Sequence, residues 1–216
     1  MEVPPVLMSD KGEAVTQVDR AIHAAVEVRD EHTAVHGLQV ARLSEALGRA
    51  IALESDEIDA LREAAHIHDV GKIGIPDRVL LKPSPLSSHE WEIMKSHSIL
   101  GARIVAAQSS LHWQQHHAST GIVNAIRHHH ERFDGRGYPD GLAGDAIPLW
   151  ARIILIADCY DALTETRAYR PPLAHDAAMS VMAEERGSVS DPELFDVFAR
   201  TIENSPWRAG APAQSE

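Results

Sequence analysis

Apolar residues at helical spacing recur along most of this chain, and in several segments the apolar row ends on histidine or aspartate. Ile122 and Ile126 are followed at the next helical position by His129. Ile154 is followed in the same way by Asp158, and Asp161 comes one helical turn later. A buried carboxylate without a partner is costly, so it usually becomes neutral or finds a cation. The pattern therefore predicts helices whose buried faces converge on ionisable side chains.

The rest of the sequence also predicts helices rather than strands. The segment RIILIA, 152–157, could form a strand by itself, but it continues into DCYDAL at helical spacing, which favours a helix. We expect an all-α fold, a single compact helical bundle with a domain at 13–205, a loose N-terminal leader at 1–12 and a flexible C-terminal tail at 206–216. Helices are predicted at about 35–47, 55–68, 87–104, 119–130, 150–163, 177–185 and 193–202, with a Gly/Pro-rich loop at about 133–148.

Charge and hydropathy argue against two classes of partner. The chain has 32 acidic and 20 basic residues and a net charge of −12, which argues against binding a nucleic acid polymer. Apolar runs stay well short of the roughly 20 residues that cross a bilayer, and the sequence start lacks the pattern of a signal peptide, so we expect no membrane partner. We expect a cytoplasmic protein, with the single cysteine, Cys159, unable to form an intramolecular disulfide.

The 14 histidines are the unusual feature of the composition, and most of them lie in short clusters beside acids. His36, the pair His68–Asp69 and His97 lie on other predicted apolar rows or at their ends. Neutral imidazoles mixed with carboxylates suit divalent ions such as Mn, Fe or Zn, and the absence of cysteine ligands argues against a thiolate site. More than four ligands indicates two ions rather than one.

Two motifs give this pattern a family resemblance. They are HIHDVGKIGIPD at 66–77 and HHERFDGRGYPDG at 129–141, and the segments MKSH, RIILIADCYDAL, TRAYR and DPELFDVF accompany them in order. From about Asp30 to Phe198 the chain resembles the HD-GYP family of cyclic di-GMP phosphodiesterases, a branch of the HD metal-dependent phosphohydrolases. The resemblance implies a helical bundle of the HD-domain type, in which the Gly/Pro-rich segment is the GYP loop.

The resemblance also implies a role for each matching position. Asp69 would bridge two ions and, with Lys72 at the substrate phosphate, form the catalytic centre. A third ion is left open at His32, where some family members have a carboxylate, although we favour two. We expect Asp161 to hydrogen-bond a ligand or the GYP loop rather than bind metal directly. The implied metal ligands are His36, His68, Asp69, His97, His129, His130 and Asp158, and the implied substrate-binding residues are Lys72, Gly137, Tyr138, Pro139, Arg167 and Arg170.

The implied activity is hydrolysis of cyclic di-GMP to pGpG, with GMP left open as a further product, by a hydroxide held between two divalent ions, Fe or Mn. Two alternatives stay open: a cyclic di-GMP-binding signalling module without turnover, and a phosphodiesterase for another cyclic dinucleotide. Protein partners in signalling and a homodimer are also left open. We expect His128 to face solvent and Arg127, Arg132 and Arg136 to be solvated charges, with ligand contact as the alternative for the arginines.

Overall fold

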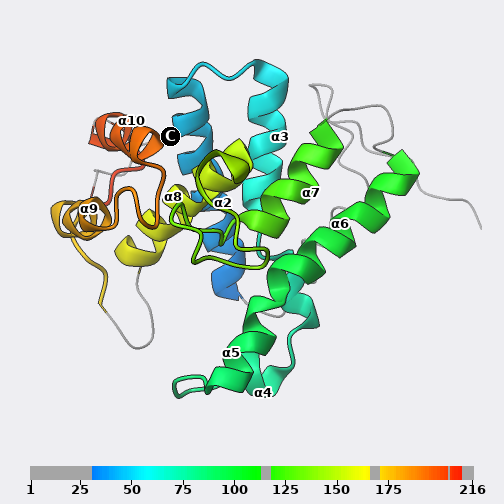
Figure 1. Ribbon diagram of the computed structural model, residues 1–216. Helices are drawn as coiled ribbons and strands as arrows, with labels where there is room; N and C mark the ends of the chain where they lie inside the picture. Colours follow the sequence, from blue (N-terminus) through cyan, green and yellow to red (C-terminus); the bar gives the residue numbers. More distant parts are fainter. Residues whose placement is uncertain (1–30, 113–117, 166–170, 204, 211–216) are drawn as a thin grey trace, which may run out of the picture.

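The computed structural model describes residues 31–112, 118–165, 171–203 and 205–210, and this part of the chain is built from helices (Figure 1). Within those ranges there is no strand, only an isolated bridge between Arg186 and Ser190. The predicted all-α fold is confirmed. The helices are α2 (Glu31–Ala50), α3 (Ser55–His66), α4 (Asp77–Leu80), α5 (Ser88–Lys95), α6 (His97–His112), α7 (Ala118–His128), α8 (Leu149–Thr164), α9 (His175–Glu184) and α10 (Pro192–Glu203), with 3-10 helices η1 (Val70–Gly74) and η2 (Gly144–Ala146).

Helix α8 is the centre of the core, because it is apolar on nearly every side. Its residues Ile153, Ile154 and Ile156 are fully buried, and the helix packs against α2, α7, α9 and α10. A helix that is hydrophobic all round has to be surrounded by other elements. The run that by itself could have formed a strand is therefore the buried central helix.

The apolar row at 35–47 is buried only in part. Val40, Leu43 and Leu47 are fully buried in the core, whereas Val35 and Leu38 are 63% and 46% exposed. Helical spacing predicts which residues share a face, but how far the neighbouring helices cover that face is decided by their packing.

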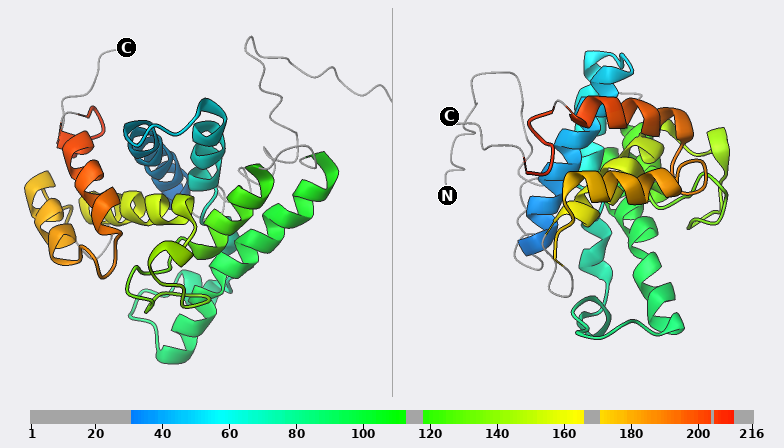
Figure 2. Two further views of the ribbon diagram at one scale, coloured as in Figure 1. Left: turned by 45° about the horizontal axis from the view of Figure 1, so that its top comes forward. Right: turned by 90° about the vertical axis from the view of Figure 1, so that its left-hand side faces the viewer.

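The predicted helix that starts at Ser87 is two helices in the structure. The capping box of Ser87 and Glu90 opens α5 as predicted, but the helix breaks at Ser96, where α5 and α6 meet. The Ser96 hydroxyl donates a hydrogen bond to the Ile93 carbonyl oxygen at 2.6 Å, and a bond of this kind competes with the helical ladder. His97 consequently lies at the start of a helix. Helices α4 and α5 extend from one end of the bundle as an arm in all views (Figure 2).

The segment at 205–210, most of which the sequence assigns to a flexible tail, packs against the bundle. Trp207 lies against the core, with the Arg42 guanidinium carbon 4.6 Å from its ring centroid. The backbone N–H of Ala209 donates a hydrogen bond to the Tyr160 hydroxyl at 2.9 Å. The leader at 1–12 lies outside the described residues, and the domain boundaries stay a prediction. None of the described helices is both long and apolar enough to span a bilayer.

Gly71 in η1 lies directly against the backbone at the start of α6. A Cβ atom at Gly71 would overlap the His97 carbonyl oxygen and the Gly101 amide nitrogen. Only glycine leaves room for this approach. Because η1 directly follows Asp69, the contact brings the carboxylate beside the first residue of α6.

We predict that Gly71→Ala destabilises the protein by about 2 kcal/mol, because the added methyl group forces two backbone segments apart. Urea unfolding measures the loss. Gly74→Ala in the same 3-10 helix is the matched control, since its Cβ would meet only the flexible end of the Leu100 side chain, at 2.9 Å. Equal losses in the two variants would contradict the close approach at Gly71.

Candidate metal centre

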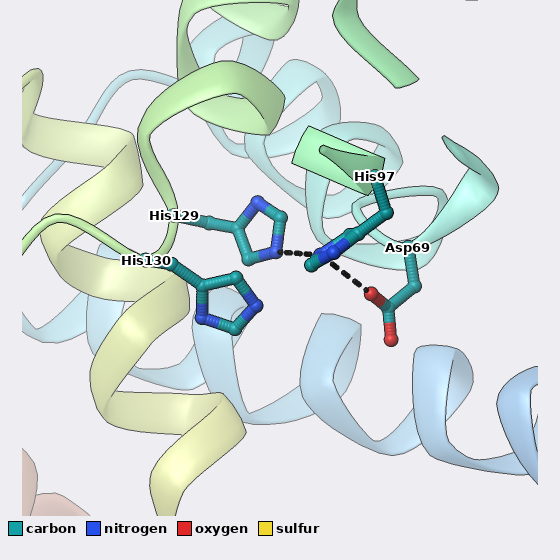
Figure 3. Close-up of side chains that lie close together, drawn as sticks. All are labelled: Asp69, His97, His129 and His130. Carbon is teal, nitrogen blue, oxygen red and sulfur yellow. Dashed lines mark hydrogen bonds and ion pairs between the residues drawn. The ribbon is translucent and has the colours of Figure 1, made fainter. Parts of the chain in front are cut away.

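Helix ends bring the predicted ligands together in one buried cluster. Asp69, His97, His129 and His130 each offer a ligand atom within 4.8 Å of the others' (Figure 3). His36 and His68 form a second such group with Asp69, so this carboxylate is common to both groups. These six residues are called the His/Asp cluster below. Asp158, the seventh predicted ligand, lies at its edge, with Oδ1 3.1 Å from His36 Nε2.

Backbone carbonyl groups orient three of the imidazole rings. The Nδ1 atom of His68 lies 2.6 Å from the Ala65 oxygen, and His97 and His129 make the same contact with the carbonyl three residues earlier, at 2.8 and 2.7 Å. A carbonyl oxygen can only accept, so each Nδ1 carries the proton and donates. In the neutral ring the lone pair is then on Nε2. The three rings are thus held with a ligand atom free.

The Nε2 lone pairs lie close to one another and to the Asp69 carboxylate, and no proton lies between these atoms to form a hydrogen bond. His97 Nε2 lies 3.3 Å from His129 Nε2 and 3.2 Å from Asp69 Oδ1. Burial and the neighbouring histidines lower the pKa of His129 well below its usual value, so a proton on that nitrogen is disfavoured. Among the described residues, His68 Nε2 is buried without a hydrogen-bond partner. Buried acceptors that converge in this way fit a divalent cation.

The two carboxylates are ionised despite their burial. Burial raises the pKa of Asp69, but the Lys72 ammonium, 2.6 Å away, outweighs it, so the pKa is well below its usual value. The pKa of Asp158 is lowered in the same way, chiefly by its hydrogen bond with His36. Burial lowers the pKa of His36, but hydrogen bonds with Asp158 and Asp161 outweigh it and raise the pKa to about 10.

The GYP loop is fastened to the end of α7 beside the cluster. The buried Glu131 carboxylate accepts hydrogen bonds from the backbone N–H groups of Asp140, at 2.7 Å, and Leu142, at 3.1 Å. A Cβ atom at Gly137 would overlap the backbone of Glu131, so this position has room only for glycine. The loop thereby places the Tyr138 ring 4.8 Å from the His130 ring, measured between centroids.

His128 does not face solvent, so that prediction was wrong. It is 9% exposed, its Nδ1 lies 2.9 Å from the Asn124 carbonyl oxygen, and its Nε2 lies 2.9 Å from Asp140 Oδ2. The GYP loop covers the last turn of α7, which sequence spacing alone does not reveal. The same carboxylate accepts two hydrogen bonds from the Arg127 guanidinium, at 2.8 Å each, so Arg127 is paired rather than simply solvated.

Other predicted residues fall into two groups. Asp161 Oδ2 lies 2.6 Å from His36 Nδ1, the hydrogen bond to a predicted ligand that the sequence suggested. Arg167 and Arg170 lie outside the described residues, as does the side chain of His32.

Sequence reasoning missed Glu131 as the anchor of the GYP loop. The signal available was an acid directly after two histidines and directly before a glycine-rich turn.

Known proteins resemble this chain over most of its length. Residues 8–194 match a family model described as HD domain. The cyclic di-GMP phosphodiesterase response regulator RpfG of Xanthomonas campestris is 39% identical over 176 residues, which cover 82% of this chain and 45% of that protein. The 3'3'-cGAMP-specific phosphodiesterase 2 of Vibrio cholerae is 34% identical over 194 residues, covering 89% of this chain and 36% of that protein.

The fold also matches a solved structure. A crystal structure of a cyclic GMP-AMP-specific phosphodiesterase of Vibrio cholerae aligns with a TM-score of 0.63 at 20% identity, covering 89% of this chain and 50% of that one. At this level of identity the match shows the fold alone. The chain spans less than half the length of the two curated relatives described above.

We predict that Glu131→Ala frees the GYP loop and destabilises the protein by about 2 kcal/mol, because two backbone N–H groups lose their buried charged acceptor. Hydrogen exchange at the Asp140 and Leu142 amides should become at least several-fold faster. Asp145→Ala in the same loop is the control, since that side chain is 93% exposed. Unchanged exchange in Glu131→Ala would show that other contacts hold the loop.

We predict that the metal-free protein is most stable near pH 6.5. Burial lowers the pKa of His130 to about 4, so the stability due to its neutral form is present above pH 6.5 and is lost as the pH falls toward 4. His36, with its pKa raised to about 10, contributes stability that is complete below pH 6.5 and is lost as the pH rises toward 10. Between its usual and its shifted pKa, each of these two histidines changes the free energy of unfolding by about 1.4 kcal/mol per pH unit.

Urea unfolding in the presence of a chelator, from pH 5 to 9, measures this profile. His130→Gln is expected to make the acid side less steep, with the slope due to the lowered pKa of His129 remaining, and to leave the alkaline side unchanged. A free energy of unfolding that rises steadily up to pH 9 would contradict the role assigned to His36.

Proposed function

Because the chain belongs to the HD domain family, we propose that it is a metal-dependent phosphodiesterase that hydrolyses cyclic di-GMP. The observation that carries the proposal is the convergence of imidazole Nε2 atoms and the Asp69 carboxylate beneath a glycine-rich loop. The relative named cyclic di-GMP phosphodiesterase response regulator supports this choice of substrate. The linear dinucleotide pGpG is the proposed product, and a time course decides whether GMP follows.

We propose that the site holds two divalent ions, Fe or Mn, with Asp69 between them. His36, His68 and Asp158 would complete one ligand set, and His97, His129 and His130 the other. The two groups of donor atoms that have Asp69 in common support this division. When bound, such ions supply Lewis-acid stabilisation of the phosphoryl oxygens and a water of lowered pKa. The proposal includes no third ion at His32.

Lys72 and Tyr138 are the proposed contacts to the substrate phosphate. The Lys72 ammonium lies at the cluster through its ion pair with Asp69 and keeps 27% of its side chain exposed. Burial and the charges of Asp69 and Asp158 raise the pKa of Tyr138, so its hydroxyl stays protonated and can donate a hydrogen bond. Further proposed contacts, from the resemblance, are Gly137, Pro139, Arg167 and Arg170.

A second candidate substrate is 3'3'-cGAMP. The Vibrio cholerae relative named as specific for it is 34% identical to this chain, close to the 39% of the cyclic di-GMP relative. Both dinucleotides present the same phosphodiester to the metal centre and differ in one base. The ratio of kcat/KM for the two substrates decides between them. A binding module without turnover is the alternative in which either nucleotide is recovered unchanged.

We also propose a cytoplasmic location, which the free Cys159 supports because an oxidising compartment is not needed. Cyclic dinucleotides are the proposed small-molecule partners, whereas protein partners in signalling and a homodimer stay predictions from the resemblance.

We predict that the protein, purified anaerobically and supplied with Mn²⁺ or Fe²⁺, converts cyclic di-GMP to pGpG. Asp69→Ala should lose most of the bound metal, essentially all turnover and the stabilisation that a bound ion provides. Metal analysis, thermal unfolding and chromatography with mass identification measure the three effects.

His89→Ala is the matched control, because His89 is an exposed histidine on α5. It should retain metal and turnover. Intact cyclic di-GMP after incubation with a metal-filled wild-type protein would overturn the proposed activity. Unchanged metal content in Asp69→Ala would overturn the ligand assignment.

A further inference from the structure

Trp91 is a large aromatic side chain that the core does not use. It is 48% exposed, and no residue of its helix, α5, is buried. Within the described residues, the apolar core forms without it. Exposed tryptophan at a cleft or surface is commonly a contact for a ligand or partner, because its flat apolar face gains by being covered.

A short aromatic path connects Trp91 with the His/Asp cluster. The Tyr138 ring lies 4.8 Å from the His130 ring, and the Trp91 ring lies 6.4 Å from the Tyr138 ring at an interplanar angle of 80°. In an edge-to-face pair each ring keeps at least one face that the other does not cover. The exposed Trp91 ring therefore lies next to Tyr138, which is a proposed contact to the substrate phosphate, and it can stack on another part of the same ligand.

A positive charge accompanies these rings. The Lys95 ammonium, one helical turn after Trp91, lies 5.7 Å from the Tyr138 centroid and 2.8 Å from a Glu92 carboxylate oxygen. Glu92 is 67% exposed, so its ion pair with Lys95 is a weak surface pair and leaves the ammonium able to contact an anionic ligand.

The first turn of the helix that carries Trp91 is closed by its own hydrogen bonds before any ligand binds. The Ser87–Glu90 capping box closes its first turn, and the Lys82 ammonium pairs with the Glu90 carboxylate at 2.5 Å. A preformed helix does not have to be ordered when its side chain stacks on a ligand, so stacking contributes more to affinity.

We propose that Trp91, with Lys95 beside it, forms a subsite that stacks on a purine base of the bound cyclic dinucleotide. The inference rests on the proposed function and extends it from the phosphate to the base. A cyclic dinucleotide whose phosphodiester lies at the cluster has bases that reach outward, and an aromatic face binds any base. The subsite would strengthen binding of cyclic di-GMP and 3'3'-cGAMP alike.

Steady-state kinetics with two substrates tests the subsite. Trp91→Ala should raise KM for cyclic di-GMP about ten-fold and change kcat little, because stacking stabilises bound substrate and transition state alike. Trp91→Phe should recover most of the affinity. With methyl p-nitrophenyl phosphate, a small diester without a nucleobase, Trp91→Ala should behave as wild type. Val181→Ala, at a remote exposed position on α9, is the control.

Two kinetic results would overturn the inference. Equal loss on both substrates would mean that Trp91 acts by positioning Tyr138, and unchanged KM on both would mean that it contacts no base.

A binding experiment tests the subsite if the wild type binds cyclic di-GMP without hydrolysing it. Calorimetry should then give a dissociation constant about ten-fold higher for Trp91→Ala than for the wild type. That result would support the subsite although the proposed activity fails. Equal affinities, or no binding by the wild type, would overturn the subsite.

Discussion

The hydrogen bond from an imidazole Nδ1 to the backbone carbonyl three residues earlier is the interaction on which the candidate site depends. It recurs at His68, His97 and His129, at the end of α3, the start of α6 and the end of α7. In each case it fixes the protonated nitrogen and directs the Nε2 lone pair inward. The remaining architecture can be understood as the packing that brings these three helix ends to one place.

Bringing several buried acceptors together costs electrostatic free energy. Neighbouring charged and hydrogen-bonding side chains offset this cost. Asp69 and Asp158 stay ionised in the interior because each has a cationic or hydrogen-bonding partner, Lys72 and His36 respectively. Desolvation keeps His129 and His130 neutral, so their nitrogens remain available as ligands. In the proposed function, cations in the cluster would give this acidic protein a locally positive site for an anionic phosphodiester.

The GYP loop and the arm of α4 and α5 would extend the candidate site beyond the proposed metal ligands. The Glu131 carboxylate holds the loop by accepting two backbone hydrogen bonds, and Tyr138 in that loop lies between the cluster and Trp91. Phosphate chemistry and base recognition would thus use adjoining surfaces, one formed at helix ends and the other on a single exposed helix.

Much of this protein could be predicted from its sequence, because apolar periodicity and short motifs are local properties. The spacing of Ile154 and Asp158 placed a carboxylate on the buried face of α8, and the HIHD and GYP motifs contain four of the six cluster residues, His68, Asp69, His129 and His130. Tertiary packing decided the rest. The break at Ser96, the burial of His128 under the loop and the nearness of Trp91 to Tyr138 depend on contacts between distant segments. No local pattern encodes such contacts, since a side chain's burial is set by whichever element folds against it.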